Sequence, residues 1–335
     1  MNATALQRPT IALAMGDPAG ISPELTAKLA ALDDAHAAAR LVFIGDKRVF
    51  DVGAAVAGTT TDFTVIGASD AIPSGTGPVF IDLKHLDPVT IERGVATKAG
   101  GAFALANYRH ALERVARGDA HAVCFTPFNK HAMRLADASY DDEIGFTAGV
   151  LGTTGPATEF NILEGLWNAR VTSHVPMADM PKLLTIDGIV AALGLANTAL
   201  KAAGFAPPRI AVAALNPHAG DGGNFGREEI DVIAPAVKVA QAKGIGCEGP
   251  FPADTVFVRA RRGDFDAVMT MYHDQGQIAM KLMGFESGVT LLGGFPFPIC
   301  TPAHGTAYDI AGKGIANIGA TRAAVLLAAS MAMRK

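Results

Sequence analysis

The chain has 335 residues, of which 50% are hydrophobic and 18% charged, so it is long enough for about two domains and can bury a large core. Its formal net charge of −4 argues against a nucleic-acid partner or an anionic membrane surface, because both require a basic face. Three widely spaced cysteines, Cys124, Cys247 and Cys300, fit a reducing compartment better than a disulfide framework. Residues 1–10 contain no long apolar run, so we expect no signal peptide and a cytoplasmic location.

The first motif follows a short apolar run at residues 11–14. It reads Gly-Asp-Pro-Ala-Gly-Ile-Ser-Pro-Glu from residue 16 and predicts a strand, a glycine loop and a helix. Ser22 is placed as the N-cap, with Pro23 at the first helical position. The helix N-terminus could receive an anion, although a plain strand–helix turn is the alternative. The loop matches neither the three-glycine dinucleotide fingerprint nor a P-loop.

Further apolar runs alternate with helical patterns, which predicts an α/β fold with a parallel sheet covered on both faces. Residues 140–154, with Asp141, Asp142 and Glu143, match no standard element and predict a lid or domain edge. The predicted strands are 41–45, 78–82, 122–125, 169–173, 209–215, 267–272 and 289–292, and the clearest helices are 101–117 and 186–203.

Polar side chains cluster after the strand at 267–272, where His273 and Asp274 lead into a helix that carries Lys281. The carboxyl ends of parallel strands are where open α/β sheets bind ligands. A second polar loop begins at His304. The segment therefore predicts a site, with helix capping as the alternative role of His273 and Asp274.

Three histidines, His174, His218 and His273, each directly follow an apolar strand, so a parallel sheet would bring them to one edge. Three imidazoles with an open fourth position are typical of a catalytic zinc site. Cobalt, manganese and magnesium are alternatives. Asp254 and Asp274 are candidate carboxylates for supporting the ligands or moving a proton.

Four motifs, in order along nearly the whole chain, resemble the 4-hydroxythreonine-4-phosphate dehydrogenase family: Ala-Met-Gly-Asp-Pro-Ala-Gly-Ile from residue 14, Asn-Pro-His-Ala-Gly from 216, Met-Tyr-His-Asp-Gln-Gly from 271 and His-Gly-Thr-Ala from 304. The resemblance implies two α/β/α domains, similar to the isocitrate and isopropylmalate dehydrogenases, with the active site in the cleft between them. We expect residues 1–130 plus 300–335 in the first domain and residues 131–299, with the metal histidines, in the second.

The resemblance also implies a homodimer whose divalent metal is held by histidines from both subunits, and an oxidation by NAD followed by loss of carbon dioxide. No arginine is evidently placed for a ribose phosphate, which favours NAD over NADP. The resemblance assigns His174, His218 and His273 to the metal and Lys281 to the substrate, and the loop with His304, Gly305, Thr306, Asp309 and Gly312 resembles the cofactor loop of the isopropylmalate dehydrogenases. Together with the residues considered above, we expect Lys281, Asp274 and Asp254 in catalysis, and Lys281, Asn216 and Thr290 at the substrate.

The substrate prediction follows from departures from the family pattern. Residues 140–146 lack its Gly-His-Thr-Glu motif, and Cys300 and Thr290 stand where an arginine and an asparagine are usual. An acidic, arginine-poor pocket binds phosphate poorly. We therefore expect a non-phosphorylated hydroxy acid, a terephthalate cis-dihydrodiol of aromatic catabolism. The alternative is 4-hydroxythreonine 4-phosphate or 4-phosphothreonate, and a third reading is a non-catalytic protein that binds a metal or nucleotide.

Overall fold

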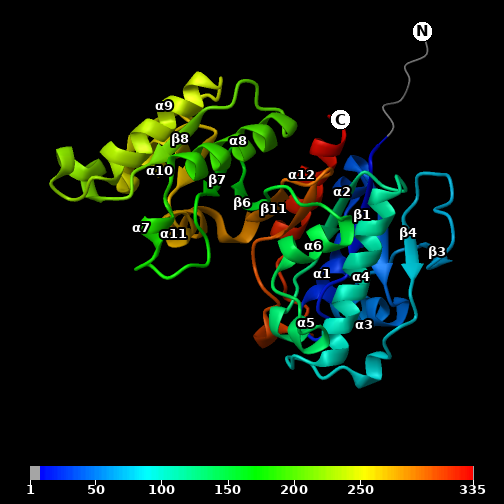
Figure 1. Cartoon of the computed structure of the whole chain (residues 1–335). Coiled ribbons are helices and arrows are strands. Elements are labelled where there is room, and N and C mark those ends of the chain that lie inside the picture. Colours follow the sequence, from blue (N-terminus) through cyan, green and yellow to red (C-terminus); the bar gives the residue numbers. More distant parts are fainter. Residues whose placement is uncertain (1–7, 335) are drawn as a thin grey trace, which may run out of the picture. The chain divides into compact units, whose positions relative to one another are not determined.

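The computed structural model describes residues 8–334, which form two compact units (Figure 1). The first unit comprises Met1–Pro156 and Phe295–Lys335, and the second comprises Ala157–Gly294. From the sequence we expect the second domain to begin at residue 131 and to end before residue 300. The division lies after 156 and 294 because helices α5 (Lys130–Ala136) and α6 (Glu143–Leu151) pack against α4 (Lys98–Ala116). Residues 1–7, part of the segment without an apolar run, lie outside the described residues.

The first unit is built on a parallel sheet whose strands are apolar and almost completely buried, as in sheets covered on both faces. The strand order is β3-β4-β2-β1-β5-β12. The strands are β1 (Thr10–Ala14), β2 (Arg40–Gly45), β3 (Thr64–Gly67), β4 (Val79–Asp82), β5 (Ala122–Phe125) and β12 (Ile299–Pro302), and the remaining helices are α1 (Ser22–Ala30), α2 (Asp33–Ala38), α3 (Lys47–Ala57) and α12 (Gly319–Ala332).

The second unit has the strand order β11-β6-β7-β10-β8-β9. Strands β7, β10, β8 and β9 are parallel, as predicted, whereas β6 runs antiparallel to β7 and β11. Only Glu164 and Gly165 separate β6 from β7, and so short a connection permits only an antiparallel pair. The strands are β6 (Thr158–Leu163), β7 (Leu166–Arg170), β8 (Ile210–Ala213), β9 (Cys247–Phe251), β10 (Ala267–Thr270) and β11 (Val289–Gly293).

The helices of the second unit surround this sheet, and two non-α segments follow β8 (Figure 1). One is the η2 segment, Pro217–Gly223, and the other is a π-helix, Glu229–Ile233, directly before α9. A π-helix inside a helical stretch is uncommon and often marks a functional site. The α-helices are α7 (Met180–Leu183), α8 (Ile186–Ala202), α9 (Ala234–Ala242), α10 (Ala253–Arg261) and α11 (His273–Gly284).

Two local predictions are corrected by the structure. Residues 143–151, predicted to be irregular, form helix α6, capped by Asp142, whose carboxylate accepts from the Gly145 N–H at 2.7 Å, and ended by Gly152 at φ +65°. Ser22 does not cap α1. Its hydroxyl donates to the Pro127 carbonyl at 2.7 Å, so it joins the first loop to the loop after β5.

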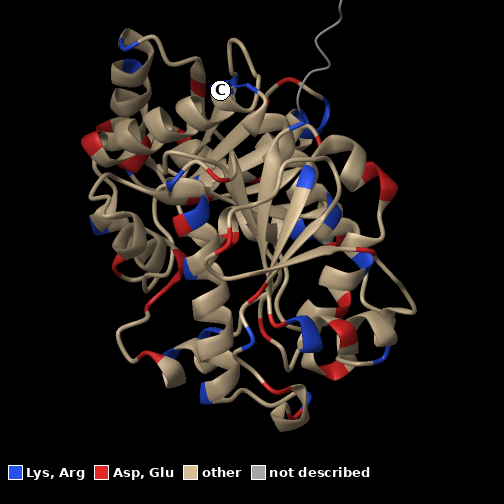
Figure 2. Cartoon of the chain, turned by 90° about the vertical axis from the view of Figure 1, so that its right-hand side faces the viewer, with Lys and Arg blue, Asp and Glu red and all other residues tan. Residues whose placement is uncertain are grey.

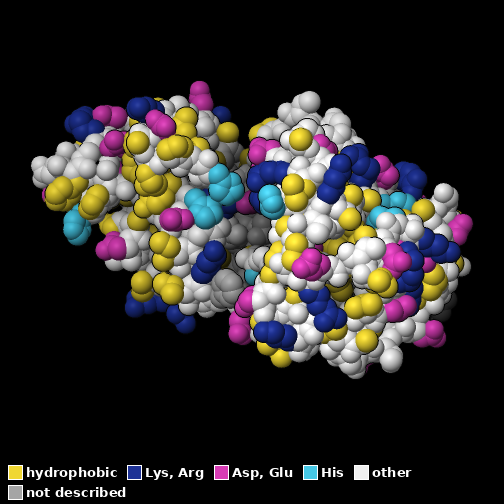
Figure 3. All heavy atoms as spheres, turned by 90° about the horizontal axis from the view of Figure 1, so that it is seen from below, with side chains coloured by type: hydrophobic (Ala, Val, Ile, Leu, Met, Phe, Trp, Pro, Cys, Tyr) yellow, Lys and Arg dark blue, Asp and Glu magenta, His cyan; other side chains and the backbone are white. Residues whose placement is uncertain are grey.

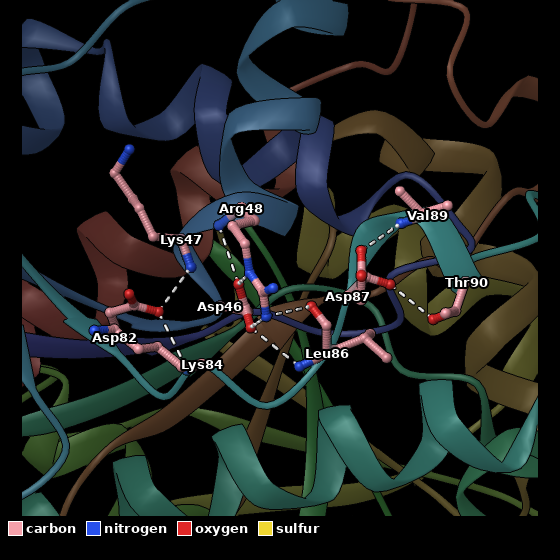
Figure 4. A network of polar contacts seen from close by, with 9 residues as sticks. All are labelled: Asp46, Lys47, Arg48, Asp82, Lys84, Leu86, Asp87, Val89 and Thr90. Carbon is pink, nitrogen blue, oxygen red and sulfur yellow. Dashed lines mark hydrogen bonds and ion pairs between the residues drawn. The ribbon is translucent and has the colours of Figure 1, made fainter.

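The carboxyl ends of β2 and β4 carry acidic side chains with structural roles (Figure 4). Asp46 is fully buried and accepts from the Arg48 guanidinium and from the Leu86 N–H. Asp82 accepts from the backbone N–H groups of Lys47 and Lys84. These carboxylates organise the loops at this end of the sheet.

Between residues 8 and 334, no helix is long and apolar enough to cross a membrane. Basic and acidic positions are interspersed over the face of the first unit in Figure 2, in line with the low net charge. The three cysteines are free and buried.

Candidate functional site

The strands that precede the three histidines are parallel neighbours, with β10 between β7 and β8. Their carboxyl ends therefore lie at the same edge of the sheet. His174 follows β7, His218 follows β8 and His273 begins α11 directly after β10. The loops after β7 and β10 are joined, because Thr172 donates both its N–H and its hydroxyl to the Met271 carbonyl.

His174 and His273 lie together, with ring centres 5.4 Å apart and planes at 43°. An imidazole that binds zinc through a nitrogen at about 2.0–2.1 Å has its ring centre about 3.2 Å from the ion, so two such rings at a tetrahedral angle lie about 5.2 Å apart. The observed separation fits two imidazoles that share one cation.

Asp274 supplies the second feature that fits a metal. Its carboxylate Oδ1 lies 2.7 Å from Nδ1 of His273. A carboxylate on one ring nitrogen leaves Nε2 as the free donor and orients the ring, which is the common arrangement around metal-bound histidines. Asp274 therefore lies beside a candidate ligand, while its side chain stays largely exposed to solvent.

His218 is not part of this pair. Within residues 8–334, no group of three or more histidine, cysteine, aspartate or glutamate side chains is placed to hold a metal ion. Figure 3 shows the histidines of the left-hand unit at two separate places. The expected meeting of three histidines within one chain is thus found for two of them only.

The backbone around His218 is unusual, because His218, Ala219 and Asp221 all have positive φ, as do the neighbouring glycines. A left-handed conformation costs a non-glycine residue about 1–2 kcal/mol and persists only where the surroundings enforce it. Asn216, predicted to bind substrate, donates its amide N–H groups to the carboxylates of Glu228 and Glu229. The loop is therefore held by specific bonds.

Helix α11 presents an exposed face that carries Asp274 and Lys281, seven residues apart. Between and beside them lie Ile278, 60% exposed, and Leu282, 84% exposed. These two large apolar side chains lie exposed on the helix that carries the candidate catalytic groups. Asp254 is also exposed, in the first turn of α10 beyond the end of β9.

Thr290, the other predicted substrate residue, belongs to a polar network that sequence reasoning missed. Its hydroxyl accepts from the Asn161 amide at 3.3 Å, and Asn161 Oδ1 accepts from Arg170 and Gln277. Arg170 also pairs with Glu159 at 2.6 Å and donates to Ser173, the residue before His174. Burial lowers the pKa of Arg170, and Glu159 opposes this effect. The only sequence signal was a charged residue at the end of an apolar strand.

In the first unit, the loops after β1, β5 and β12 interlock at the carboxyl edge of the sheet. Asp17 N–H donates to the Pro127 carbonyl, and Ile21 N–H donates to the Thr306 carbonyl at 3.0 Å. A Cβ at Gly20 would lie 2.6 Å from that same Thr306 oxygen, so only glycine fits there. The predicted cofactor loop at His304 is thereby joined to the first glycine motif.

The other predicted cofactor residues line the same loop. His304 Nδ1 lies 3.1 Å from the Gly305 carbonyl, and burial lowers the pKa of His304. Gly305 and Asp309 are exposed. Gly312, at φ +75°, lies against the Arg93 guanidinium, since a Cβ there would be 2.7 Å from Arg93 Nη1. An arginine thus adjoins this loop, which sequence reasoning had not placed there.

Within these loops, the buried Asp17 pairs with the partly buried Tyr308. The Tyr308 hydroxyl donates to Asp17 Oδ2 at 2.5 Å, and the Ala19 N–H donates to Oδ1. Burial raises the pKa of Asp17, and these two hydrogen bonds oppose the rise. The pair ties the cofactor loop to the β1–α1 loop across 291 positions of sequence.

A family model described as "Pyridoxal phosphate biosynthetic protein PdxA" matches residues 37–328. A Rhizobium meliloti protein named "Putative 4-hydroxythreonine-4-phosphate dehydrogenase 2" is 62% identical over 98% of this chain and 95% of its own length. The D-threonate 4-phosphate dehydrogenase of Salmonella typhimurium is 35% identical over 98% of this chain and all of its own.

Solved structures of the same family are also similar to this chain. The 4-hydroxythreonine-4-phosphate dehydrogenase of Klebsiella pneumoniae superposes with a TM-score of 0.84 at 35% identity, over 99% of this chain and 100% of that one. A terephthalate 1,2-cis-dihydrodiol dehydrogenase from Burkholderia xenovorans is less similar, with a TM-score of 0.65 at 29% identity, over 93% of this chain and 95% of that one.

These findings overturn the predicted terephthalate substrate and aromatic catabolism. The inference failed because it treated Cys300, Asp142 and Glu143 as the lining of an open, acidic pocket. Cys300 is completely buried inside strand β12, so it lines no pocket. Asp142 caps α6, and Glu143 pairs with Lys130 at 3.0 Å, so neither is a free charge. Phosphate can also be bound by backbone N–H groups at helix ends, without the missing motif.

The Rhizobium meliloti relative matches 98% of the chain, and the family model, over residues 37–328, spans the last three of the four motifs. The names of the curated relatives describe dehydrogenases, which oxidise a CH–OH group. This chain therefore belongs to the family of the pyridoxal phosphate biosynthetic protein PdxA and is an oxidoreductase.

Proposed function

We propose that this chain oxidises 4-hydroxythreonine 4-phosphate with NAD and a divalent metal, and that the resulting β-keto acid loses carbon dioxide. The observation that carries the substrate is the 62% identity to a relative of that name over 98% of the chain. D-threonate 4-phosphate is the second candidate, because several curated relatives with 35–39% identity carry that name. Both molecules have a carboxylate, a hydroxyl on the next carbon but one and a terminal phosphate. They differ in the group on the second carbon, an amine or a hydroxyl.

The residues of the second unit support this chemistry. A cation held by His174 and His273 would polarise the substrate hydroxyl, and a nicotinamide would accept the hydride. Zinc suits imidazole ligands best, with cobalt, manganese and magnesium as alternatives. Asp274 orients His273 through Nδ1.

Lys281 and Asp254 complete the proposed residues. We assign Lys281 to the substrate carboxylate and to the proton that replaces carbon dioxide on the second carbon, because an exposed ammonium on the α11 face can both bind an anion and donate a proton. Asp254 takes up the hydroxyl proton or supports the site, and Asn216 and Thr290 contact substrate through their oxygens. The loop from His304 to Gly312 binds the cofactor.

A second copy of the chain completes the site in this proposal. His218 lies apart from the other two histidines within one chain, and the exposed face of α11 carries two large apolar residues beside Lys281. A symmetric dimer would bury such a face and could bring the partner's histidine to the pair. We therefore propose a homodimer with a shared active site.

The test is an absorbance assay for reduced cofactor, with zinc-loaded protein and each of four substrates: 4-hydroxythreonine 4-phosphate, D-threonate 4-phosphate and the two compounds without phosphate. Because Arg93 adjoins the cofactor loop, NAD and NADP are offered in parallel. We expect turnover on the first substrate with NAD. Preference for D-threonate 4-phosphate would favour the second candidate, and equal rates on the dephosphorylated compounds would refute both.

His273→Ala is the matching variant, since it removes one imidazole of the pair at 5.4 Å. We expect a loss of at least about a hundredfold in turnover. His131→Ala, on helix α5 of the first unit, is the control and should retain activity.

A further inference from the structure

A buried carboxylate holds the backbone that leads to His218. Glu229 begins the π-helix and is only 3% exposed. Its Oε1 accepts from the backbone N–H of Leu215 at 2.8 Å and of Asn216 at 2.7 Å. Both residues lie beyond the end of β8, where the strand ladder no longer pairs them. Glu229 therefore replaces the missing strand partner at the start of the histidine loop.

The second oxygen of Glu229 reaches further into the loop. Oε2 accepts from the Asn216 amide at 3.0 Å. A Cβ at Gly220 would lie 2.7 Å from this oxygen, and one at Gly226 would lie 2.4 Å from the Asn216 amide nitrogen. The glycines let the backbone of the loop pass directly over the carboxylate. Both carboxylate oxygens of Glu229 therefore bind the segment that leads to His218.

Gln275 connects this arrangement to the strand that carries His273. Its Oε1 accepts from the Met271 N–H at 2.7 Å, and its Nε2 donates to the Ala214 carbonyl at 2.7 Å. Ala214 directly precedes the two residues that Glu229 binds. The ends of β10 and β8 are therefore joined by one side chain, and the end of β8 is joined to the π-helix by another.

We propose that Glu229 is a positioning residue for His218: it enforces the left-handed backbone that presents this imidazole to a divalent cation. The proposal rests on the metal role proposed above for His218. An exposed loop with several non-glycine residues at positive φ would otherwise relax. Mutation of a group that orients a metal ligand typically lowers metal affinity by about 10–100-fold.

The test compares Co²⁺ binding by the wild type, Glu229→Gln, His218→Ala and Asp231→Asn, without substrate or cofactor. The cobalt absorption bands report the ligand set directly. Glutamine has one acceptor oxygen and one NH₂ group, so it loses either the two backbone bonds or the bond to Asn216. We expect a loss of about 10–100-fold in affinity. Asp231→Asn is the control, because Asp231 lies on the same π-helix but its carboxylate pairs with the exposed Arg227.

A second measurement begins with the wild type. Hydrogen exchange of the wild type should show protected amides at Leu215 and Asn216, although neither belongs to a strand. In Glu229→Gln these two amides should exchange faster, while Val212 inside β8 stays protected. Unprotected amides at both positions in the wild type would show that the carboxylate does not hold the loop, and would overturn the proposal.

The outcomes separate the two hypotheses. If His218→Ala binds cobalt as tightly as the wild type, the metal role of His218 is wrong and its positioning by Glu229 is wrong with it. If His218→Ala loses affinity and Glu229→Gln keeps it with unchanged bands, only the role of Glu229 is wrong. Loss in both variants, with Asp231→Asn unchanged, supports the proposal.

Discussion

At the scale of single residues, long-range hydrogen bonds decide what the motifs do. The first glycine motif suggests an anion site, yet Asp17 is buried and accepts from Tyr308, a residue near the other end of the sequence. Sequence spacing contains no sign of this pair. The structure shows that the first motif supports the predicted cofactor loop, through the bonds between Asp17, Ile21 and the 306–308 segment.

Tyr308→Phe tests this pair through pH. The Tyr308 hydrogen bond lowers the pKa of Asp17, so its loss raises that pKa further and destabilises the ionised carboxylate more than the protonated one. We expect a loss of about 1–2 kcal/mol in the free energy of unfolding at about pH 8, because high pH favours the ionised carboxylate. The loss should shrink towards about pH 4 as Asp17 becomes protonated. Urea titrations at both values measure it, and an equal loss at both would contradict the assignment.

At the scale of elements, glycines show where helices contact the sheet. Gly276 of α11 lies against Asn168 of β7, and a Cβ there would be 2.2 Å from the amide oxygen. Asn168 is fully buried and donates to the carbonyls of Ala169 and Val268, so it cannot move aside. This contact sets the position of the helix that begins with His273.

Gly276→Ala should therefore destabilise the chain by about 1–3 kcal/mol and reduce turnover, because it displaces α11. Gly194→Ala is the matched control. It lies in α8 of the same unit, with open space at its Cβ, and should stabilise by about 0.5–1 kcal/mol. Thermal unfolding and the rate assay measure both. A Gly276→Ala protein as stable and active as the wild type would show that α11 can shift freely.

The prediction for helix α6 was wrong because it weighed the amino-acid composition of the segment and overlooked its capping residues. Residues 143–151 contain glycines and β-branched residues that disfavour helix, and we predicted an irregular segment. Asp142 and Gly152 were the caps that indicated a helix, and packing on α4 stabilises it, with the Tyr108 and Thr147 hydroxyls 2.6 Å apart. The acidic stretch therefore begins a helix: Asp142 caps it and Glu143 pairs with Lys130.

At the scale of the whole molecule, the proposed dimer depends on the exposed face of α11. Leu282→Asp should shift the protein to monomers and abolish turnover, because a charge is costly at a buried interface. Val89→Asp is the control, since Val89 is an apolar side chain that is 90% exposed, as Leu282 is exposed, but belongs to the first unit. Light scattering after size-exclusion chromatography measures the mass. A dimeric Leu282→Asp protein would refute this interface.

The sequence by itself determined the α/β class, most strand positions and the family, because apolar periodicity and short motifs are local in the chain. It also placed three histidines at strand ends. Only the tertiary structure decided that His174 and His273 meet while His218 lies apart, since this depends on left-handed backbone and on bonds between distant residues such as Gln275 and Ala214. It likewise decided that Cys300 is core, because burial arises from packing between elements that lie far apart in sequence.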